Sequence, residues 1–178
     1  MNVVPFYDPR TFTLTYVVHE GGDAVVIDPV LDYDPIASAT STDSLEKVVA
    51  FLDVKQLKLH AVLETHAHAD HLSGSQYLSK RYGAKVVIGH RIAEVQGTFK
   101  GVFNLDPDFP VDGRQFDRLV RQGETITAGA LADDLIGLVT FARFADSPSP
   151  PTLDHDYVID VLRRIRPAGP GGEDGTAI

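Results

Sequence analysis

The chain of 178 residues contains no cysteine, which excludes disulfide bridges, thiolate metal ligands and a cysteine nucleophile. It also contains no apolar run of the length of a signal peptide or a membrane span. Basic residues are in the minority, with 16 Lys and Arg against 25 Asp and Glu, and the net charge is −9. Because nucleic acid and anionic membranes require a basic surface, neither is expected as a partner. These absences favour a soluble cytoplasmic protein.

The composition is that of an ordinary globular protein, with 43% hydrophobic and 23% charged residues. A chain of this length buries a hydrophobic core of its own. Strands are expected at 12–18, 24–27, 57–63, 85–88 and 116–120, helices at 43–53, 72–82 and 91–103, and a surface loop at 31–41. This alternation of strands and helices predicts an α/β protein with parallel strands.

Residues 66–71 concentrate three histidines and one aspartate, with only alanine between them. These four residues are His66, His68, Asp70 and His71. A predicted buried strand precedes the segment and a predicted helix follows it, so the segment is expected on the loop that leaves the carboxyl end of a strand. Since residues two apart in an extended chain point the same way, His66 and His68 are expected to converge on one ion.

Imidazole and carboxylate groups are the ligands that zinc, iron, manganese and nickel accept in proteins. A single His-x-His also occurs by chance in exposed loops, where it is only a polar surface feature. The full string, placed between a strand and a helix, makes that alternative improbable. The sequence therefore predicts a metal site.

The string Thr65-His66-Ala67-His68-Ala69-Asp70-His71 resembles the Thr-His-x-His-x-Asp-His signature of the metallo-β-lactamase superfamily. The surrounding residues are similar to the branch of that superfamily that contains glyoxalase II and the persulfide (sulfur) dioxygenases. The similar segments are Val26–Val30, Leu63–Ser73, and Gly89–Ile92 followed by Val95, Gln96, Phe99 and Lys100. The resemblance extends over roughly the first three quarters of the chain.

The resemblance implies the αββα sandwich of the metallo-β-lactamase fold. It also implies that His66 and His68 hold a first metal ion, that Asp70 and His71 hold a second one, and that Asp70 orients a reacting water as the catalytic residue. Asp28, at the end of the strand 24–27, is expected to stand behind the metal loop as a hydrogen-bond acceptor for a ligand imidazole. A simple strand-ending Asp before Pro is the alternative for Asp28.

Two activities follow from the resemblance. In the first, Fe(II) held by two histidines and a carboxylate serves a dioxygenase acting on glutathione persulfide. In the second, one or two Zn ions serve a thioester hydrolase similar to glyoxalase II. Both use a small thiol-derived substrate, and the residues after Asp28 favour the dioxygenase. The sequence leaves the oligomeric state open between a monomer and a homodimer.

The resemblance ends near residue 132, which divides the chain into a segment 1–131 and a divergent segment 132–178. The superfamily's downstream Thr-Pro-Gly-His-Thr turn is absent, and Ala145–Pro151 stands roughly where it would fall. The only later histidine is His155, between Asp154 and Asp156.

Three interpretations of this divergence compete. The residues 154–156 could replace the missing ligands, although a polar turn before a short strand at 157–159 is favoured. The chain could be a truncated or frame-shifted member of the family, since the tail 163–172 is rich in Arg, Pro and Gly, which favours disorder. In the third interpretation the domain is degenerate and binds metal loosely.

Overall fold

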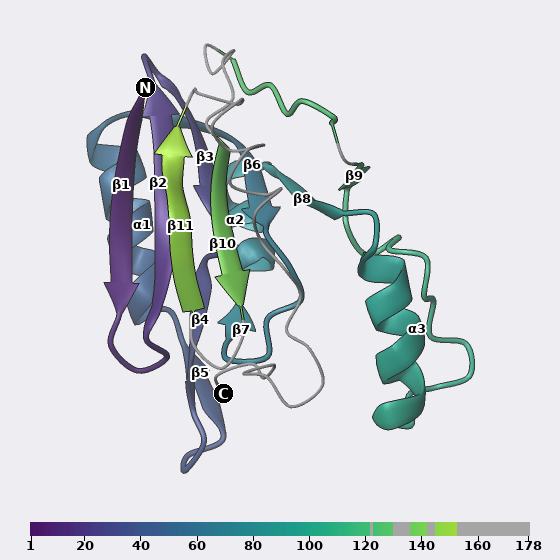
Figure 1. Cartoon of the computed structure of the whole chain (residues 1–178). Coiled ribbons are helices and arrows are strands. Elements are labelled where there is room, and N and C mark those ends of the chain that lie inside the picture. Colours follow the sequence, from purple (N-terminus) through teal and green to yellow (C-terminus); the bar gives the residue numbers. More distant parts are fainter. Residues whose placement is uncertain (122, 130–135, 142–144, 153–178) are drawn as a thin grey trace. The chain divides into compact units, whose positions relative to one another are not determined.

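The computed structural model describes residues 1–121, 123–129, 136–141 and 145–152 (Figure 1). The chain divides into two compact units, Met1–Ala132 and Asp133–Ile178. In the second unit, β10 (Ile136–Phe141) and β11 (Ala145–Thr152) form an antiparallel two-stranded sheet. The expected polar turn at 154–156, the strand at 157–159 and the tail at 163–172 lie outside the described residues.

The first unit is built on a six-stranded mixed sheet in the order β1-β2-β3-β6-β8-β9. Its strands are β1 (Asn2–Asp8), β2 (Thr13–Glu20), β3 (Asp23–Ile27), β6 (Lys58–Glu64), β8 (Lys85–Gly89) and β9 (Arg118–Val120). The first three are antiparallel neighbours, whereas β3, β6, β8 and β9 run parallel. The carboxyl ends of four strands therefore meet at one edge of the sheet, as the predicted α/β alternation requires.

Two helices, α1 (Asp43–Val54) and α2 (Ser75–Tyr82), cover one face of this sheet (Figure 1). Leu45, Leu52 and Leu78 are fully buried there against strand residues such as Val26 and Val62. Each such side chain stabilises the fold by roughly 1.5–3 kcal/mol relative to an exposed one. The third helix, α3 (Ile92–Val102), buries only Ile92. No helix among the described residues is long and apolar enough to cross a membrane.

The strand β6 contains a β-bulge and contributes to apolar clusters on both faces of the sheet. The pairing with β3 shifts between the pairs Ala24–Leu59 and Val25–Ala61, which leaves His60 as the extra residue. After this shift, Leu59 and Val62 belong to the core under the helices. Ala61 packs in a second cluster on the opposite face, where residues such as Val87 and Ala128 contact it.

The expectation of a loop at 31–41 is wrong. The segment forms the hairpin of β4 (Val30–Asp34) and β5 (Ala39–Ser41), and β4 also pairs with β7 (Leu72–Ser73). Because Leu72 and Ser73 pair with β4, the helix expected from residue 72 begins only at Ser75. Pairing between distant segments thus decided the structure of two stretches whose local sequence indicated something else.

The start of α1 also differs from the sequence pattern. Asp43 and Glu46 have capping-box spacing, but the N-cap is Thr42, which makes no side-chain capping bond. Instead Asp32 of β4, whose side chain is 3% exposed, accepts hydrogen bonds from Ser44 N at 2.7 Å and Ser44 Oγ at 2.8 Å. A neighbouring strand therefore satisfies the helix terminus in place of a local cap.

Candidate metal centre

The histidine-rich loop leaves the carboxyl end of β6, as the sequence predicts. The neighbouring strand β3 ends at Ile27, and Asp28 follows it with a positive φ of +48°. Asp28 N donates a hydrogen bond to Leu63 O at 3.0 Å, which continues the pairing of β3 with β6 for one more residue. This contact brings the Asp28 carboxylate beside the first residue of the loop, Thr65.

Asp28 is the hydrogen-bond acceptor behind the loop. Its carboxylate accepts hydrogen bonds from Thr65 N at 2.8 Å and Thr65 Oγ1 at 2.7 Å, and His68 Nε2 lies 3.0 Å from its Oδ1. Burial by itself raises the pKa of Asp28, but the hydrogen bonds from His68 and Thr65 outweigh it and lower the pKa below the usual value. An ionised carboxylate therefore faces the ring of His68.

His68 is the central residue of the site, and its side chain is 7% exposed. Its Nε2 faces the carboxylates of Asp28 and Glu64, with Glu64 Oε2 at 3.2 Å, and its Nδ1 lies 3.8 Å from Asp70 Oδ1. Burial by itself lowers the pKa of His68, but the hydrogen bonds to Asp28 and Glu64 raise the pKa to about 9. The two carboxylates thus hold the ring with Nδ1 turned toward Asp70.

His71 supplies a test of whether the residues fit a metal ion. Its side chain is 1% exposed, and its Nδ1 lies 3.3 Å from Asp70 Oδ1. Burial and the charge of His68 lower the pKa of His71, which favours the neutral imidazole that metals require. Its Nε2 is buried and has no hydrogen-bond partner among the described residues. A buried imidazole nitrogen of this kind fits a metal ligand.

The ligand atoms of His68, Asp70 and His71 all lie within 4.8 Å of one another. His66 does not belong to this group, although its ring centroid lies 4.2 Å from that of His68. Its Nδ1 lies 2.8 Å from Thr65 Oγ1. Because Thr65 donates its only hydroxyl proton to Asp28, His66 Nδ1 must be the donor in this contact. The pairing of His66 with His68 on one ion stays a prediction.

Glu64 is the residue of the site that sequence reasoning missed. It forms a second group with Asp28 and His68, whose ligand atoms also lie within 4.8 Å of one another. The Glu64 side chain is 3% exposed, its Oε1 accepts a hydrogen bond from Ser73 Oγ, and its Oε2 is buried with the Nε2 atom of His68 3.2 Å away. Its position at the end of an apolar strand, directly before the histidine loop, is the sequence feature that could have indicated Glu64 as a site residue.

A cavity of about 390 Å³ opens beside the site. His68, Asp70 and His71 line one part of it, and the other lining residues include Arg10 from the β1–β2 turn and Tyr33 from β4. This volume suits a small organic ligand. His90, which follows β8, donates its backbone N–H to Val120 O at 2.8 Å and belongs to neither ligand group of the described residues.

Residues 8–143 match the metallo-β-lactamase superfamily. The chain belongs to this superfamily. It is 42% identical over 134 residues to a probable metallo-hydrolase of Burkholderia pseudomallei, an alignment that covers 74% of this chain and 46% of that protein. It is 39% identical over 132 residues to Glyoxylase B2 of Dictyostelium discoideum, which covers 74% of this chain and 45% of that protein.

A hydroxyacylglutathione hydrolase of Rhodopseudomonas palustris is 30% identical over 143 residues, with 76% of this chain and 44% of that protein covered. The solved structure of ETHE1 from Myxococcus xanthus superposes with a TM-score of 0.52 at 24% identity, over 83% of this chain and 52% of that one. The chain thus spans less than half the length of these three curated relatives.

These comparisons confirm the predicted fold class, the metallo-β-lactamase fold, and the family is one of metal-dependent hydrolases whose members bind metal ions. The mixed sheet with α1 and α2 on one face is the part of that fold that the first unit supplies. Of the predicted αββα sandwich, the first unit thus supplies the six-stranded sheet and the helices on one of its faces. The assignment of 1–131 as the metallo-β-lactamase-like segment and of 132–178 as a divergent one stays a prediction.

Replacing Asp28 with Ala is expected to weaken Zn(II) binding by about tenfold to a hundredfold, because the ring of His68 loses the carboxylate that orients it. Asp28→Asn keeps an oxygen acceptor without the charge, so its Zn(II) affinity is expected to lie between that of Asp28→Ala and that of the unchanged protein. Competition against a chromophoric chelator measures the affinities. Asp108→Ala, on an exposed loop, is the matched control. Equal affinities for all four proteins would contradict the role of Asp28.

Proposed function

We propose that His68, Asp70 and His71 bind Fe(II), and that the chain provides this centre to a dioxygenase acting on glutathione persulfide. The observation that carries the proposal is the grouping of two imidazoles and one carboxylate within 4.8 Å. That ligand set, with open positions for further ligands, is typical of non-haem Fe(II) oxygenases. The motif context around residues 26–30 and 63–73 supports the same branch of the superfamily.

The chain's own residues would orient the ligands and receive the substrate. Asp28 and Glu64 hold His68 so that Nδ1 faces Asp70, and the buried His71 offers Nε2. Arg10, whose side chain is 57% exposed, lines the adjacent cavity and suits a carboxylate of a glutathione derivative. Asp70, as the catalytic residue, would position the reacting water.

The bound iron would supply the redox chemistry that O₂ activation requires. Overall, the two atoms of O₂ and the oxygen of one water would join the outer sulfur of the persulfide. The products are sulfite, glutathione and protons, so oxygen and sulfur balance without another reductant. A glutathione derivative as substrate agrees with the cytoplasmic location expected from the absence of cysteine.

A second candidate is hydrolysis of a glutathione thioester with one or two Zn ions. It is favoured by the relative named hydroxyacylglutathione hydrolase, which is 30% identical over 143 residues. In this version the bound metal would lower the pKa of a water molecule, and Asp70 would orient that water toward the thioester carbonyl. Asp70 and His71 would hold the second ion.

The metal that the chain selects distinguishes these candidates. The full chain would be purified without added metal, and its iron and zinc would be measured by mass spectrometry. Affinities for Fe(II), under anaerobic conditions, and for Zn(II) would then be compared. Retained iron with about one ion per chain supports the dioxygenase, retained zinc supports the hydrolase, and binding of neither metal contradicts both. Light scattering on the same sample tests the homodimer.

A further inference from the structure

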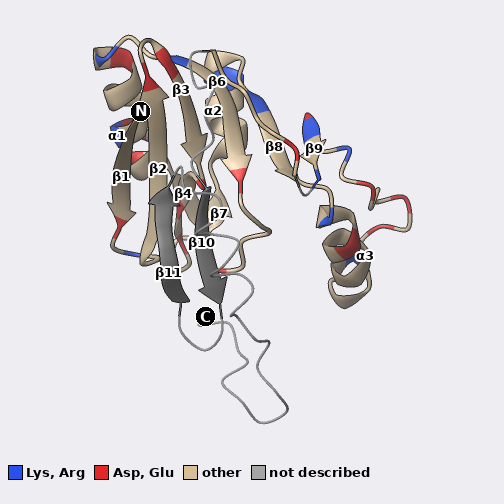
Figure 2. Cartoon of the chain, turned by 45° about the horizontal axis from the view of Figure 1, so that its top comes forward, with Lys and Arg blue, Asp and Glu red and all other residues tan. Residues whose placement is uncertain are grey.

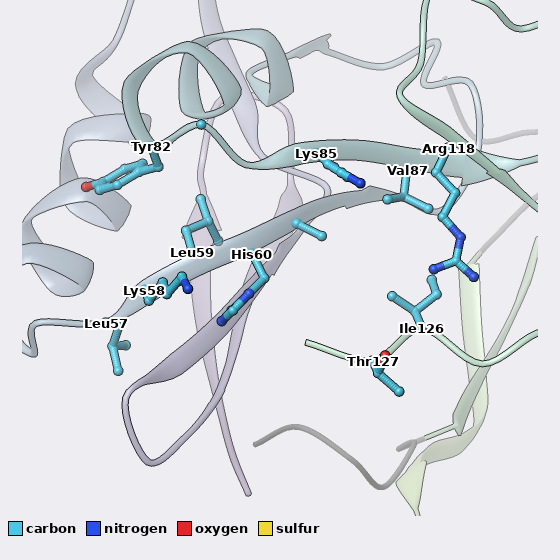
Figure 3. Close-up of a pocket in the computed structure, with 12 residues that line it drawn as sticks. Leu57, Lys58, Leu59, His60, Tyr82, Lys85, Val87, Arg118, Ile126 and Thr127 are labelled. Carbon is cyan, nitrogen blue, oxygen red and sulfur yellow. The ribbon is translucent and has the colours of Figure 1, made fainter. Parts of the chain in front are cut away.

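A second cavity, of about 460 Å³, lies at the edge of the sheet where β6, β8 and β9 begin (Figure 3). This is the edge opposite to the one that carries the histidine loop, because the three strands run parallel. All residues that line the cavity belong to the first unit of the chain. The cavity is therefore separate from the candidate metal centre.

Three cations line this cavity, and each is the first residue of its strand. They are Lys58 of β6, Lys85 of β8 and Arg118 of β9. In the sheet, Lys85 pairs with Ala61, and Arg118 pairs with Val87. Residues that pair in this way lie on the same face, so the register places Lys85 and Arg118 on the face that carries the Ala61 and Val87 cluster.

None of the three cations forms an ion pair among the residues that the structure describes. Arg118 Nη2 donates one hydrogen bond to Thr125 O at 3.2 Å. Figure 2 shows basic residues where β6, β8 and β9 begin, on a protein whose net charge is −9. Three cations that form no ion pair with a described carboxylate concentrate positive potential at this cavity, although acidic residues outnumber basic ones in the chain.

Among the residues that the structure describes, no Asp or Glu lines the cavity. The acidic residue closest in the strand register is Asp23, which pairs with Lys58 across β3 and β6. The Oδ1 atom of Asp23 lies 2.5 Å from the Nε2 atom of His60. His60 is itself a lining residue, and its contact with Asp23 lies at the Lys58 end of the cavity. Within the described part of the chain, Lys85 and Arg118 form no ion pair with a carboxylate.

Apolar side chains complete the lining, and they include Ala61, Val87 and Ile126. Figure 3 shows Val87 and Ile126 near the Arg118 side of the cavity, with Lys85 next to them. A ligand there would meet an apolar surface and, beside it, ammonium and guanidinium groups. Lys and Arg are the side chains that bind carboxylate, sulfonate and phosphate groups.

We propose that this cavity binds an amphipathic organic anion, in which a carboxylate, sulfonate or phosphate is attached to an aryl or acyl group. The acidic group would contact Lys85 and Arg118, and the apolar part would lie against Val87 and Ile126. The volume of about 460 Å³ suits a ligand of this size. The site does not depend on the metal centre or on its activity.

The test uses the full 178-residue chain and 8-anilinonaphthalene-1-sulfonate as the probe, followed by its fluorescence. We expect saturable binding of one probe per chain. The double variant Lys85→Gln with Arg118→Gln is expected to weaken binding by about tenfold to a hundredfold, because two charge-assisted contacts are lost. Circular dichroism and Zn(II) affinity verify that this surface variant keeps its fold.

The matched control is Lys47→Gln with Lys80→Gln, which removes the same charge from exposed positions of α1 and α2. It is expected to bind the probe as the unchanged chain does. N-phenyl-1-naphthylamine, which has a similar ring system without the sulfonate, is expected to bind at least tenfold more weakly. The proposal is overturned by equal binding of the neutral probe, by an equal loss in the control variant, or by no saturable binding to the full chain.

Discussion

Replacing both His66 and His68 with alanine is expected to remove the metal from the protein, with a loss of affinity of about a hundredfold or more. His68 belongs to both groups of ligand atoms, and its ring lies beside that of His66. Removing both imidazoles leaves Asp70 and His71 as the ligands of the loop, and two ligands hold a divalent ion loosely. Metal content after gel filtration and a Zn(II) titration measure the loss.

The matched control is His19→Ala, which also removes an imidazole. His19 lies on β2 and is 9% exposed, with its ring centroid 5.7 Å from that of Phe51. It belongs to neither group of ligand atoms among the described residues, so metal binding is expected to stay unchanged. If the double variant at 66 and 68 retains its metal, the loop is not the metal site.

The 178-residue chain by itself is expected to show weak or no activity as a persulfide dioxygenase or thioesterase. The chain spans 46%, 45% and 44% of the relatives described above. The candidate ligands among the described residues come from the loop after β6 and from its carboxylate neighbours, and these residues supply few ligands to an ion. Errors of about 1 Å in position cost on the order of a hundredfold in rate.

A chain extended with the downstream half of one of these relatives is expected to gain about a hundredfold or more in turnover. Steady-state assays of both proteins, reconstituted with Fe(II) and separately with Zn(II), measure the difference. The extended chain carrying His66→Ala and His68→Ala is the control and should remain inactive. Full activity of the 178-residue chain would show that residues 133–178 complete the site. The frame-shift interpretation would then be abandoned, and sequencing of the coding DNA tests it directly.

The position of the metal loop could be predicted because it depends on local patterns. The apolar run before residue 64 and the helix expected at 72–82 placed the histidines at the end of a strand, although α2 begins only at Ser75. The hairpin of β2 and β3, the helices α1 and α3, and Gly83 as the left-handed C-cap of α2 follow from equally local signals. The place of Asp28 behind the loop also agrees with the prediction.

Other features of the site could not be predicted, because they depend on residues far apart in the chain. The strands β1 and β4 are held by pairing with β2 and β7, and Asp32 replaces a local cap at α1. Glu64 and His68 are only four residues apart, but their contact depends on the conformation of the loop, which the local pattern did not predict.

The sequence by itself determined the superfamily signature, the residue types of the metal centre and the strand on which they stand. These depend on residue identity and short-range period, which a chain displays before it folds. Only the tertiary structure decided that His68 groups with Asp70 and His71, that Asp28 and Glu64 face its Nε2, and that Lys85 and Arg118 share a cavity. Strand register brings Asp28 to His68 and Lys85 to Arg118, which are far apart in the sequence, and the fold of the loop sets the contacts of His68 with its near neighbours.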